Sequence, residues 1–227
     1  MSDIVTNWSR KPPTTPWVML AISFLCLFFA LMYSFATPLA QQALIDVLGA
    51  VPARTSAMLS LPLTDWVGNG MLSLVASLFL HASWLHLAGN LAYLWVFGLP
   101  VERQMGGFLL ALLFLLGGVL SHLILAARLP DLDIPIVGAS GAVSAVVGTY
   151  LGLFPYRSIG LYVPLGLYLQ FARVPAVIVI GSWFTLQLVY TVFGPISGFV
   201  AWWTHLAGFT LGLMFAFLVR AVSYLRN

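Results

Sequence analysis

Long apolar runs separated by short polar stretches dominate the chain. Runs of about 20 mostly apolar residues are long enough to cross a bilayer as helices. By that criterion we expect spans over residues 17–36, 83–100, 108–127, 175–193 and 201–222, with a shorter, small-residue-rich span over 140–154. The hydropathy pattern therefore predicts an all-α polytopic membrane protein built from a six-helix bundle.

The segments between these runs are polar or of mixed character. Residues 37–80 carry Asp46, Arg54 and Asp65 among apolar residues, which predicts a structured loop lying partly in the membrane interface. The run over 158–171 is apolar but contains Pro164 and Gly166, so we expect it to be interfacial rather than spanning. We expect a polar tail over 1–16 and one membrane domain over 17–227.

Composition supports a membrane environment. The chain is 61% hydrophobic and 7% charged, whereas soluble domains carry roughly 25% charged residues. The pI near 9.2 rests on few charges in total, so it reports membrane orientation rather than nucleic-acid binding. With the termini inside, the cytosolic side holds seven of the nine basic residues and the outer side only Arg54 and Arg128. The positive-inside rule therefore predicts cytosolic termini.

Ser140 is the first polar residue at membrane depth that suggests chemistry. It follows an outer loop and opens the short span, where the helix dipole and unpaired amides favour a developing negative charge. A hydroxyl there can attack a carbonyl and leave the oxyanion beside N–H donors. The alternatives are a small residue at a helix crossing, or an N-cap. A catalytic Ser140 would need a base.

His205 is the candidate base. Gly208 lies next to it on one helix face, and Gly208 with Gly212 forms a Gly-x-x-x-Gly pattern that allows close backbone approach. If that face meets the small stripe that begins at Gly141, the imidazole is carried towards Ser140. The alternative is a histidine that only hydrogen-bonds a neighbouring helix. No Asp or Glu falls inside a predicted span, so a serine–histidine dyad would have no buried carboxylate.

His86 and Asn90 form the third polar site. Four residues apart on a helix, they share a face and could donate hydrogen bonds to an oxyanion. Hydrogen bonding between helices is the alternative. His81 and His86 do not have metal-site spacing, so we expect no metal ion. His122 has no polar partner nearby in sequence, and we interpret it as a packing residue.

Together these motifs resemble the rhomboid family of intramembrane serine proteases. The resemblance covers nearly the whole chain from about residue 17, and four motifs occur in the family's order. They are Gly138-Ala139-Ser140-Gly141, His81 with His86 and Asn90, Glu102 with Gly106, and His205 with Gly208 and Gly212.

The resemblance implies that Ser140 is the nucleophile and His205 the general base, with His86, Asn90 and the Ser140 amide as the oxyanion hole. It further implies transmembrane protein substrates cleaved near the outer face, contact with membrane lipids, no cofactor, and a place in a prokaryotic plasma (inner) membrane. The loop over 37–80 resembles the family's membrane-embedded first loop. Ser144 stands where some members carry a tyrosine that stacks on the base, and the first loop lacks the Trp-Arg pair because Val67 follows Trp66.

The fifth span resembles the helix that gates substrate entry. Its bulky Trp183, Phe184 and Tyr190 are expected to wedge it against the second span, and the Gly194-Pro195 break to tie its outer end loosely. Because water must reach Ser140 to finish hydrolysis, we also expect a cavity that opens to the outer face.

Two other functions stay open. A non-catalytic rhomboid-like protein would bind membrane segments, although such relatives usually lose the serine or histidine that this chain keeps. A small transporter would also place polar residues at depth, but transporters often show two homologous halves, and no such repeat is visible. An aspartyl intramembrane protease is excluded because no aspartate lies within a predicted span.

Overall fold

A computed structural model describes residues 15–67, 70–165, 168–193 and 196–225. The described chain is mostly helical, and a helix occupies each apolar run that was expected to span the membrane. Four helices are long and apolar enough to cross a membrane: Trp17–Phe35, Trp84–Met105, Gly107–Arg128 and Trp202–Val222. Two apolar helices are shorter, Ser140–Leu153 and Ala176–Val189.

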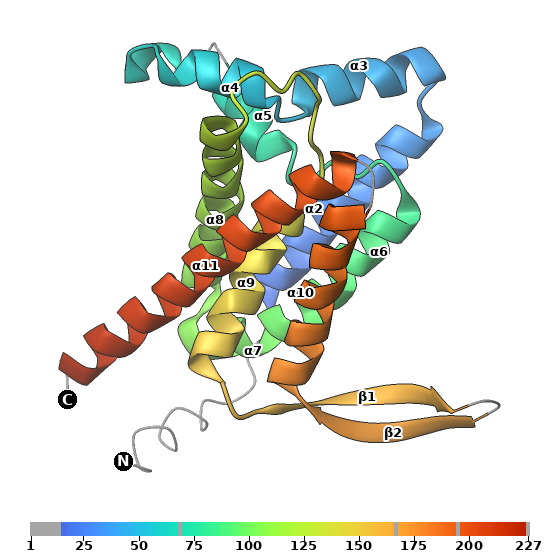
Figure 1. Cartoon of the computed structure of the whole chain (residues 1–227), viewed down its shortest axis with the longest axis vertical. Helices are drawn as coiled ribbons and strands as arrows, with labels where there is room; N and C mark the ends of the chain where they lie inside the picture. The colour runs from blue at the N-terminus through green and yellow to red at the C-terminus, as the bar shows by residue number, and fades with distance from the viewer. Residues whose placement is uncertain (1–14, 68–69, 166–167, 194–195, 226–227) are drawn as a thin grey trace.

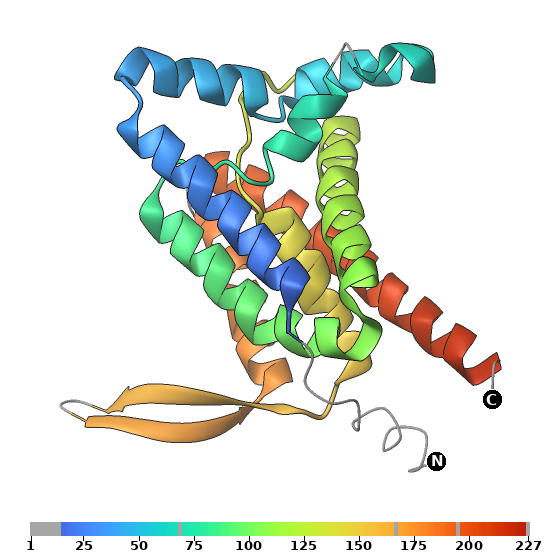
Figure 2. The same cartoon turned by 180° about the vertical axis from the view of Figure 1, so that it is seen from behind.

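Helix α9 (Ser140–Leu153) lies in the middle of the bundle in both views (Figures 1 and 2). It packs mainly against α8 (Gly107–Arg128) and α11 (Ile196–Leu225). Its glycines make close packing feasible: a Cβ at Gly148 would collide with the Phe209 carbonyl oxygen, and one at Gly152 would lie 2.5 Å from Ala216 Cβ. The small-residue stripe therefore buries α9 backbone to backbone against α11.

The second apolar run continues beyond its expected end at Pro100. It consists of α6 (Trp84–Tyr93), a π-helical turn η4 (Leu94–Gly98) and α7 (Leu99–Met105). Proline lacks an N–H and normally breaks a helix. Here Pro100 stands in the first turn of α7, directly after the π-turn, where the regular hydrogen-bond ladder is already interrupted. The expected boundary is therefore wrong.

The N-terminal helix α2 (Trp17–Phe35) is fastened to α7 by a buried carboxylate. The two Glu102 oxygens accept the Val18 and Met19 backbone N–H groups, each at 3.1 Å. A negative charge at the first turn of a helix satisfies unpaired donors and complements the helix dipole. Gly106, at φ +89°, then ends α7. Glu102 and Gly106 thus hold the fold at the end opposite Ser140.

The first loop forms a layer across one end of the bundle (Figure 1). It contains α3 (Pro38–Leu48), α4 (Pro52–Leu59), the 3-10 turn η2 (Leu63–Asp65) and α5 (Met71–Ala76). The segment before α9 pairs with this layer, because Ala50 and Ile136 exchange two backbone hydrogen bonds of 2.9 Å. The loop that leads into Ser140 is therefore fixed to the first loop.

The expectation of an all-α fold is wrong at residues 158–175. There β1 (Ser158–Leu165) pairs with β2 (Tyr168–Pro175) as an antiparallel hairpin, after which α10 (Ala176–Phe193) begins. Segments rich in β-branched and aromatic residues favour strands. Figures 1 and 2 show the hairpin projecting sideways at the end opposite α3 and α4.

Candidate active site

Ser140 is the first residue of α9 and is half-buried. The N-cap position belongs to Ala139, which makes no side-chain cap, so Ser140 is not an N-cap. Gly138 turns the chain with φ +122°, a conformation that L-residues rarely adopt, and donates its N–H to Ser77 O at 2.8 Å. The backbone before the hydroxyl is thus held in a defined turn.

His81 supports the same turn from the other side. Its Nε2 accepts the Ala139 N–H at 3.4 Å, so the ring proton belongs on Nδ1, which lies 3.2 Å from Phe79 O. Burial, with a smaller contribution from His86, lowers the pKa of His81 to about 4. The imidazole is therefore neutral at pH 7 and able to accept this bond, which gives His81 a positioning role.

His86 faces the turn directly. A Cβ at Gly138 would lie 2.5 Å from His86 Cε1, so glycine is required for this imidazole to pack on the backbone two residues before Ser140. The His81 and His86 rings lie edge to face with centroids 5.2 Å apart. Asn90 is buried one turn along α6, and its Nδ2 donates to His86 O at 3.1 Å. The structure thus gathers His81, His86 and Gly138, with Asn90 directed to its own helix.

His205 reaches the site through the α9–α11 crossing. A Cβ at Gly208 would collide with Gly141 O, and one at Gly212 with Ala145 O. The Gly-x-x-x-Gly face therefore meets the small stripe on α9. At this crossing Thr204 O lies 3.8 Å from the position of a Cβ on Gly141, so the residues next to His205 and Ser140 are neighbours.

The His205 imidazole is 6% exposed. Neither of its ring nitrogens has a hydrogen-bond partner in the described part of the chain, so no bond to the Ser140 hydroxyl is formed. Catalytic hydrogen bonds are often long without substrate and tighten when it binds.

Trp183 of α10 is the aromatic partner of His205, with ring centroids 5.4 Å apart and an interplanar angle of 35°. Trp183 also contacts Tyr93 of α6, with ring centroids 5.5 Å apart. Ser144, which replaces the expected tyrosine, donates its hydroxyl to Ser140 O at 2.7 Å. The ring that lies against His205 thus comes from α10 rather than α9.

Phe184 was expected to wedge α10 against the second span, but its ring contacts are with another helix. Its ring packs on Phe209 and Trp202 of α11, at 4.6 and 5.7 Å between centroids. Both rings contact α11, but successive residues on a helix point about 100° apart, and it is Trp183 that also reaches Tyr93 of the second span. The Tyr190 side chain and the Gly194-Pro195 break lie outside what the structure describes.

His122 was missed as a residue near the site. It lies fully inside the bundle, and its Nε2 is 3.3 Å from Ser77 Oγ, which in turn donates to Leu74 O. Because the Ser77 carbonyl holds Gly138, His122 supports the turn before Ser140 indirectly. A partner 45 residues away in sequence leaves no signal in local spacing.

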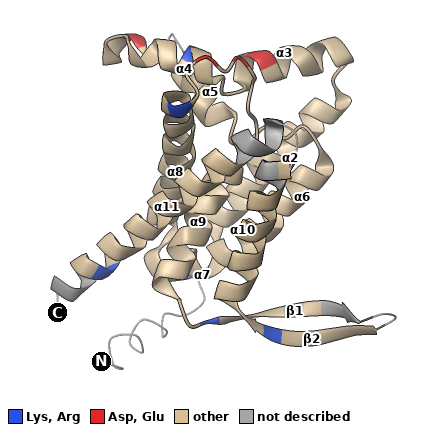
Figure 3. Ribbon diagram, viewed as in Figure 1, with Lys and Arg blue, Asp and Glu red and all other residues tan. Residues whose placement is uncertain are grey.

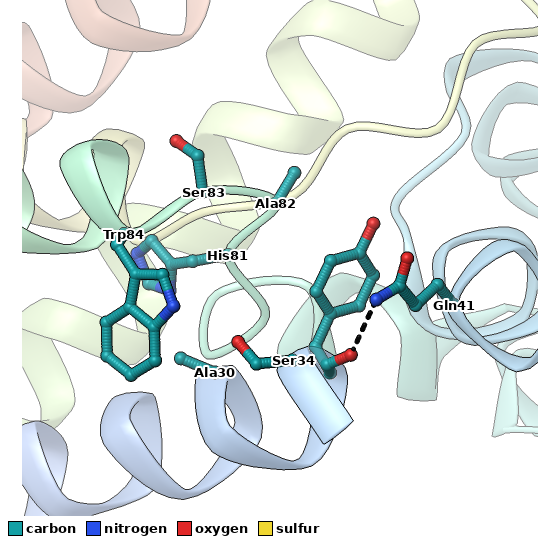
Figure 4. Close-up of a pocket in the computed structure, with 8 residues that line it drawn as sticks. Ala30, Ser34, Gln41, His81, Ala82, Ser83 and Trp84 are labelled. Atoms are coloured by element: carbon teal, nitrogen blue, oxygen red, sulfur yellow. Dashed lines mark hydrogen bonds between the residues drawn. The ribbon is translucent and has the colours of Figure 1, made fainter. Parts of the chain in front are cut away.

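A cavity of about 250 Å³ adjoins His81 on the side of α2 (Figure 4). Tyr33, Gln41 and Trp84 contribute its largest side chains, and Gln41 Nε2 donates to Tyr33 O at 3.0 Å. Neither Ser140 nor His205 lines it, so the water-filled cavity expected at Ser140 stays a prediction. No cluster of three or more potential metal ligands occurs among the described residues.

Comparison with known sequences places this arrangement in a family. The rhomboid domain matches residues 68–222, about two thirds of the chain, including every residue of the candidate site. The chain belongs to the rhomboid family. The resemblance expected from the four motifs is thereby confirmed, and residues 68–222 match a rhomboid domain.

Similar curated rhomboid proteins come from plants and bacteria. The chain is 45% identical over 69 residues to "Rhomboid-like protein 11, chloroplastic" of Arabidopsis thaliana, covering 30% of this chain and 24% of that protein. It is 31% identical over 105 residues to "RHOMBOID-like protein 6, mitochondrial" of the same plant, covering 43% and 32%. It is 29% identical over 124 residues to "Putative rhomboid protease YdcA" of Bacillus subtilis (strain 168), covering 53% and 62%. The chain thus spans about a quarter to three fifths of these relatives.

Proposed function

We propose that this rhomboid protein is an intramembrane serine endopeptidase that cleaves transmembrane segments with Ser140 and His205. The observation that carries the proposal is the crossing of α9 and α11, where Gly208 abuts the Gly141 carbonyl. That contact brings two residues to one level of the bundle. Ser140 is half-buried at the start of α9, and His205 is buried with no hydrogen-bond partner for its ring nitrogens among the described residues. A buried imidazole without hydrogen-bond partners is costly, and a catalytic role is one reason for a protein to keep it.

In this proposal, Ser140 Oγ attacks the scissile carbonyl carbon while His205 accepts the hydroxyl proton. His86, Asn90 and the Ser140 amide donate to the oxyanion. The peptide C–N bond breaks as His205 returns the proton to the leaving amine. Water then attacks the acyl ester and regenerates the serine. Trp183 orients His205 from α10, and His81 keeps the backbone before Ser140 in place.

We further propose that six helices span the membrane with both termini in the cytosol. The basic residues support this orientation: Arg54 in α4 and Arg128 at the end of α8 belong to the first-loop end, whereas Arg157 before β1, Arg173 in β2 and Arg220 in α11 belong to elements that reach the other end (Figure 3). Basic residues concentrate on the cytosolic side. Ser140 then lies near the outer surface, below the first-loop layer.

The test is cleavage of a transmembrane peptide by the purified protein in liposomes, beside labelling with a fluorophosphonate probe. Ser140→Ala and His205→Ala should both abolish cleavage, and Ser140→Ala should abolish labelling. Ser182→Ala is the matched control, because its exposed hydroxyl donates only to its own helix at Val179 O and activity should be unchanged. Full activity in Ser140→Ala would refute the proposal. Binding without cleavage by the wild-type chain would favour a non-catalytic rhomboid-like protein.

A further inference from the structure

The hairpin formed by β1 and β2 has no part in the proposed chemistry, yet it exposes large apolar and aromatic side chains. Tyr162, Tyr168 and Leu169 are each more than 70% exposed, and Phe171 is 54% exposed. Exposed apolar groups gathered on one projecting element indicate an interaction surface. The hairpin therefore needs a partner or an environment that covers it.

Neither bulk water nor the hydrocarbon core suits this element. A single two-stranded hairpin is marginally stable in water. In the hydrocarbon core, the unpaired N–H and C=O groups along its open edges would be prohibitively costly. The headgroup region offers hydrogen-bond partners for the edges and apolar surroundings for the aromatic rings, which is where tyrosine concentrates in membrane proteins.

The positive charge of the hairpin favours an anionic membrane surface. Residues 154–176 contain two basic residues, Arg157 and Arg173, and no acidic residue. Arg173 is exposed and pairs in register with Gly160, while Tyr162 pairs with Phe171. Residues directly opposite in an antiparallel pair share a face, as do those two apart along a strand. Arg173 therefore lies on the same face as the Tyr162–Phe171 pair, whose rings are in edge contact at 5.5 Å.

The hairpin is held at the level where the helices end. The Ala176 N–H that opens α10 donates to Arg157 O at 2.9 Å, and Arg157 lies over the Phe154 ring with Cζ 4.6 Å from its centroid. From this base the strands run crosswise to the helices (Figures 1 and 2). An element that leaves the bundle sideways at this level runs along the membrane surface.

We propose that the hairpin lies in the headgroup layer and binds anionic phospholipid, with Tyr162, Leu169 and Phe171, which share one face, at the acyl boundary and Arg157 and Arg173 on lipid phosphates. The exposed apolar side chains of the hairpin and its two arginines together support anionic phospholipid as the ligand, since surface basic residues are attracted to anionic leaflets. The inference is independent of the proposed protease activity. The proposed orientation is used for one point only, which is to assign this headgroup layer to the cytosolic leaflet.

The test measures the depth of spin labels on the hairpin. The single buried cysteine is first replaced, as Cys26→Ala, and labels are placed on the same face of the hairpin, at Tyr162→Cys or Leu169→Cys, in nanodiscs. In phosphatidylglycerol-containing discs both labels should be accessible to oxygen and protected from an aqueous nickel chelate by at least threefold relative to a label in the α3–α4 layer at Asp46→Cys. Equal access to the chelate at all three sites would overturn the proposal.

Lipid and protein charge are then varied separately. The protection should fall at least twofold in pure phosphatidylcholine, and the Arg157→Gln/Arg173→Gln double variant should remove this difference between lipids. Arg54→Gln, at the other end of the molecule, is the matched control and should keep it. Protection independent of lipid charge would overturn the anionic-lipid assignment, and protection that disappears when the protein is diluted would assign the hairpin to contacts between copies.

Discussion

If the proposed serine–histidine dyad operates, substitution of Gly208 by alanine should slow peptide cleavage while leaving a folded bundle. A Cβ at Gly208 would collide with Gly141 O and lie 3.0 Å from Gly141 C and 3.3 Å from Ser144 Cβ, whereas ordinary contacts begin near 3.4 Å. The colliding atoms belong to the backbone of α9 and cannot rotate away. The helices must therefore separate by several tenths of an ångström at least, at the crossing that brings His205 to the level of Ser140.

Displacement of catalytic groups by about 1 Å can cost about 10²-fold in rate. We therefore expect Gly208→Ala to lower the rate of peptide cleavage and of fluorophosphonate labelling by roughly 10- to 100-fold. Gly181→Ala on α10 is the matched control, because it also replaces a helical glycine but its new Cβ would meet no atom within 4 Å. A Gly208→Ala variant with wild-type labelling and cleavage rates would refute the claim that this crossing positions His205 relative to Ser140.

Three further substitutions test other contacts. Asn90→Ala should lower kcat roughly 10²- to 10³-fold without weakening substrate binding, as for loss of an oxyanion donor; an unchanged kcat would leave Asn90 a helix-stabilising residue. Trp183→Leu removes the ring that contacts both His205 and Tyr93, so it should slow labelling of Ser140 and loosen α10; faster labelling would show that the ring does not orient the base. Glu102→Ala leaves two backbone N–H groups of α2 without acceptors. Because these bonds are made to a charged group, the free energy of unfolding should fall by roughly 2–3 kcal/mol. The melting temperature in detergent should be lower accordingly. An unchanged melting temperature would contradict that role.

The positions of the apolar helices could be predicted from sequence because length and hydropathy decide them. The small stripe around Gly141 and the Gly208 face were also visible, since helical spacing and side-chain size are local properties. The structure brings these two faces together as expected. The orientation of the helices in the membrane, by contrast, is inferred only from the distribution of basic residues along the chain.

Contacts between distant residues were not predictable in the same way. Trp183 replaces a missing aromatic on α9 from a different helix, and the bond between His122 and Ser77 joins a span to a loop. The hairpin at 158–175 was also missed, because a short apolar run does not distinguish a strand from a helix by periodicity. Each of these features depends on what the surrounding elements place nearby rather than on local sequence.

The short length of α9 has a consequence for membrane permeability. Its 14 residues measure about 21 Å, whereas the hydrocarbon core is about 30 Å thick. With Ser140 at its outer end, water that reaches the hydroxyl has already crossed part of the insulating layer. Beyond that depth, Gly148 and Gly152 pack against Phe209 and Ala216 of α11, so the α9–α11 interface is closely packed there. Under the proposed function, the contact that brings His205 to the level of Ser140 would also close this interface, so that hydrolytic water would enter from one side only.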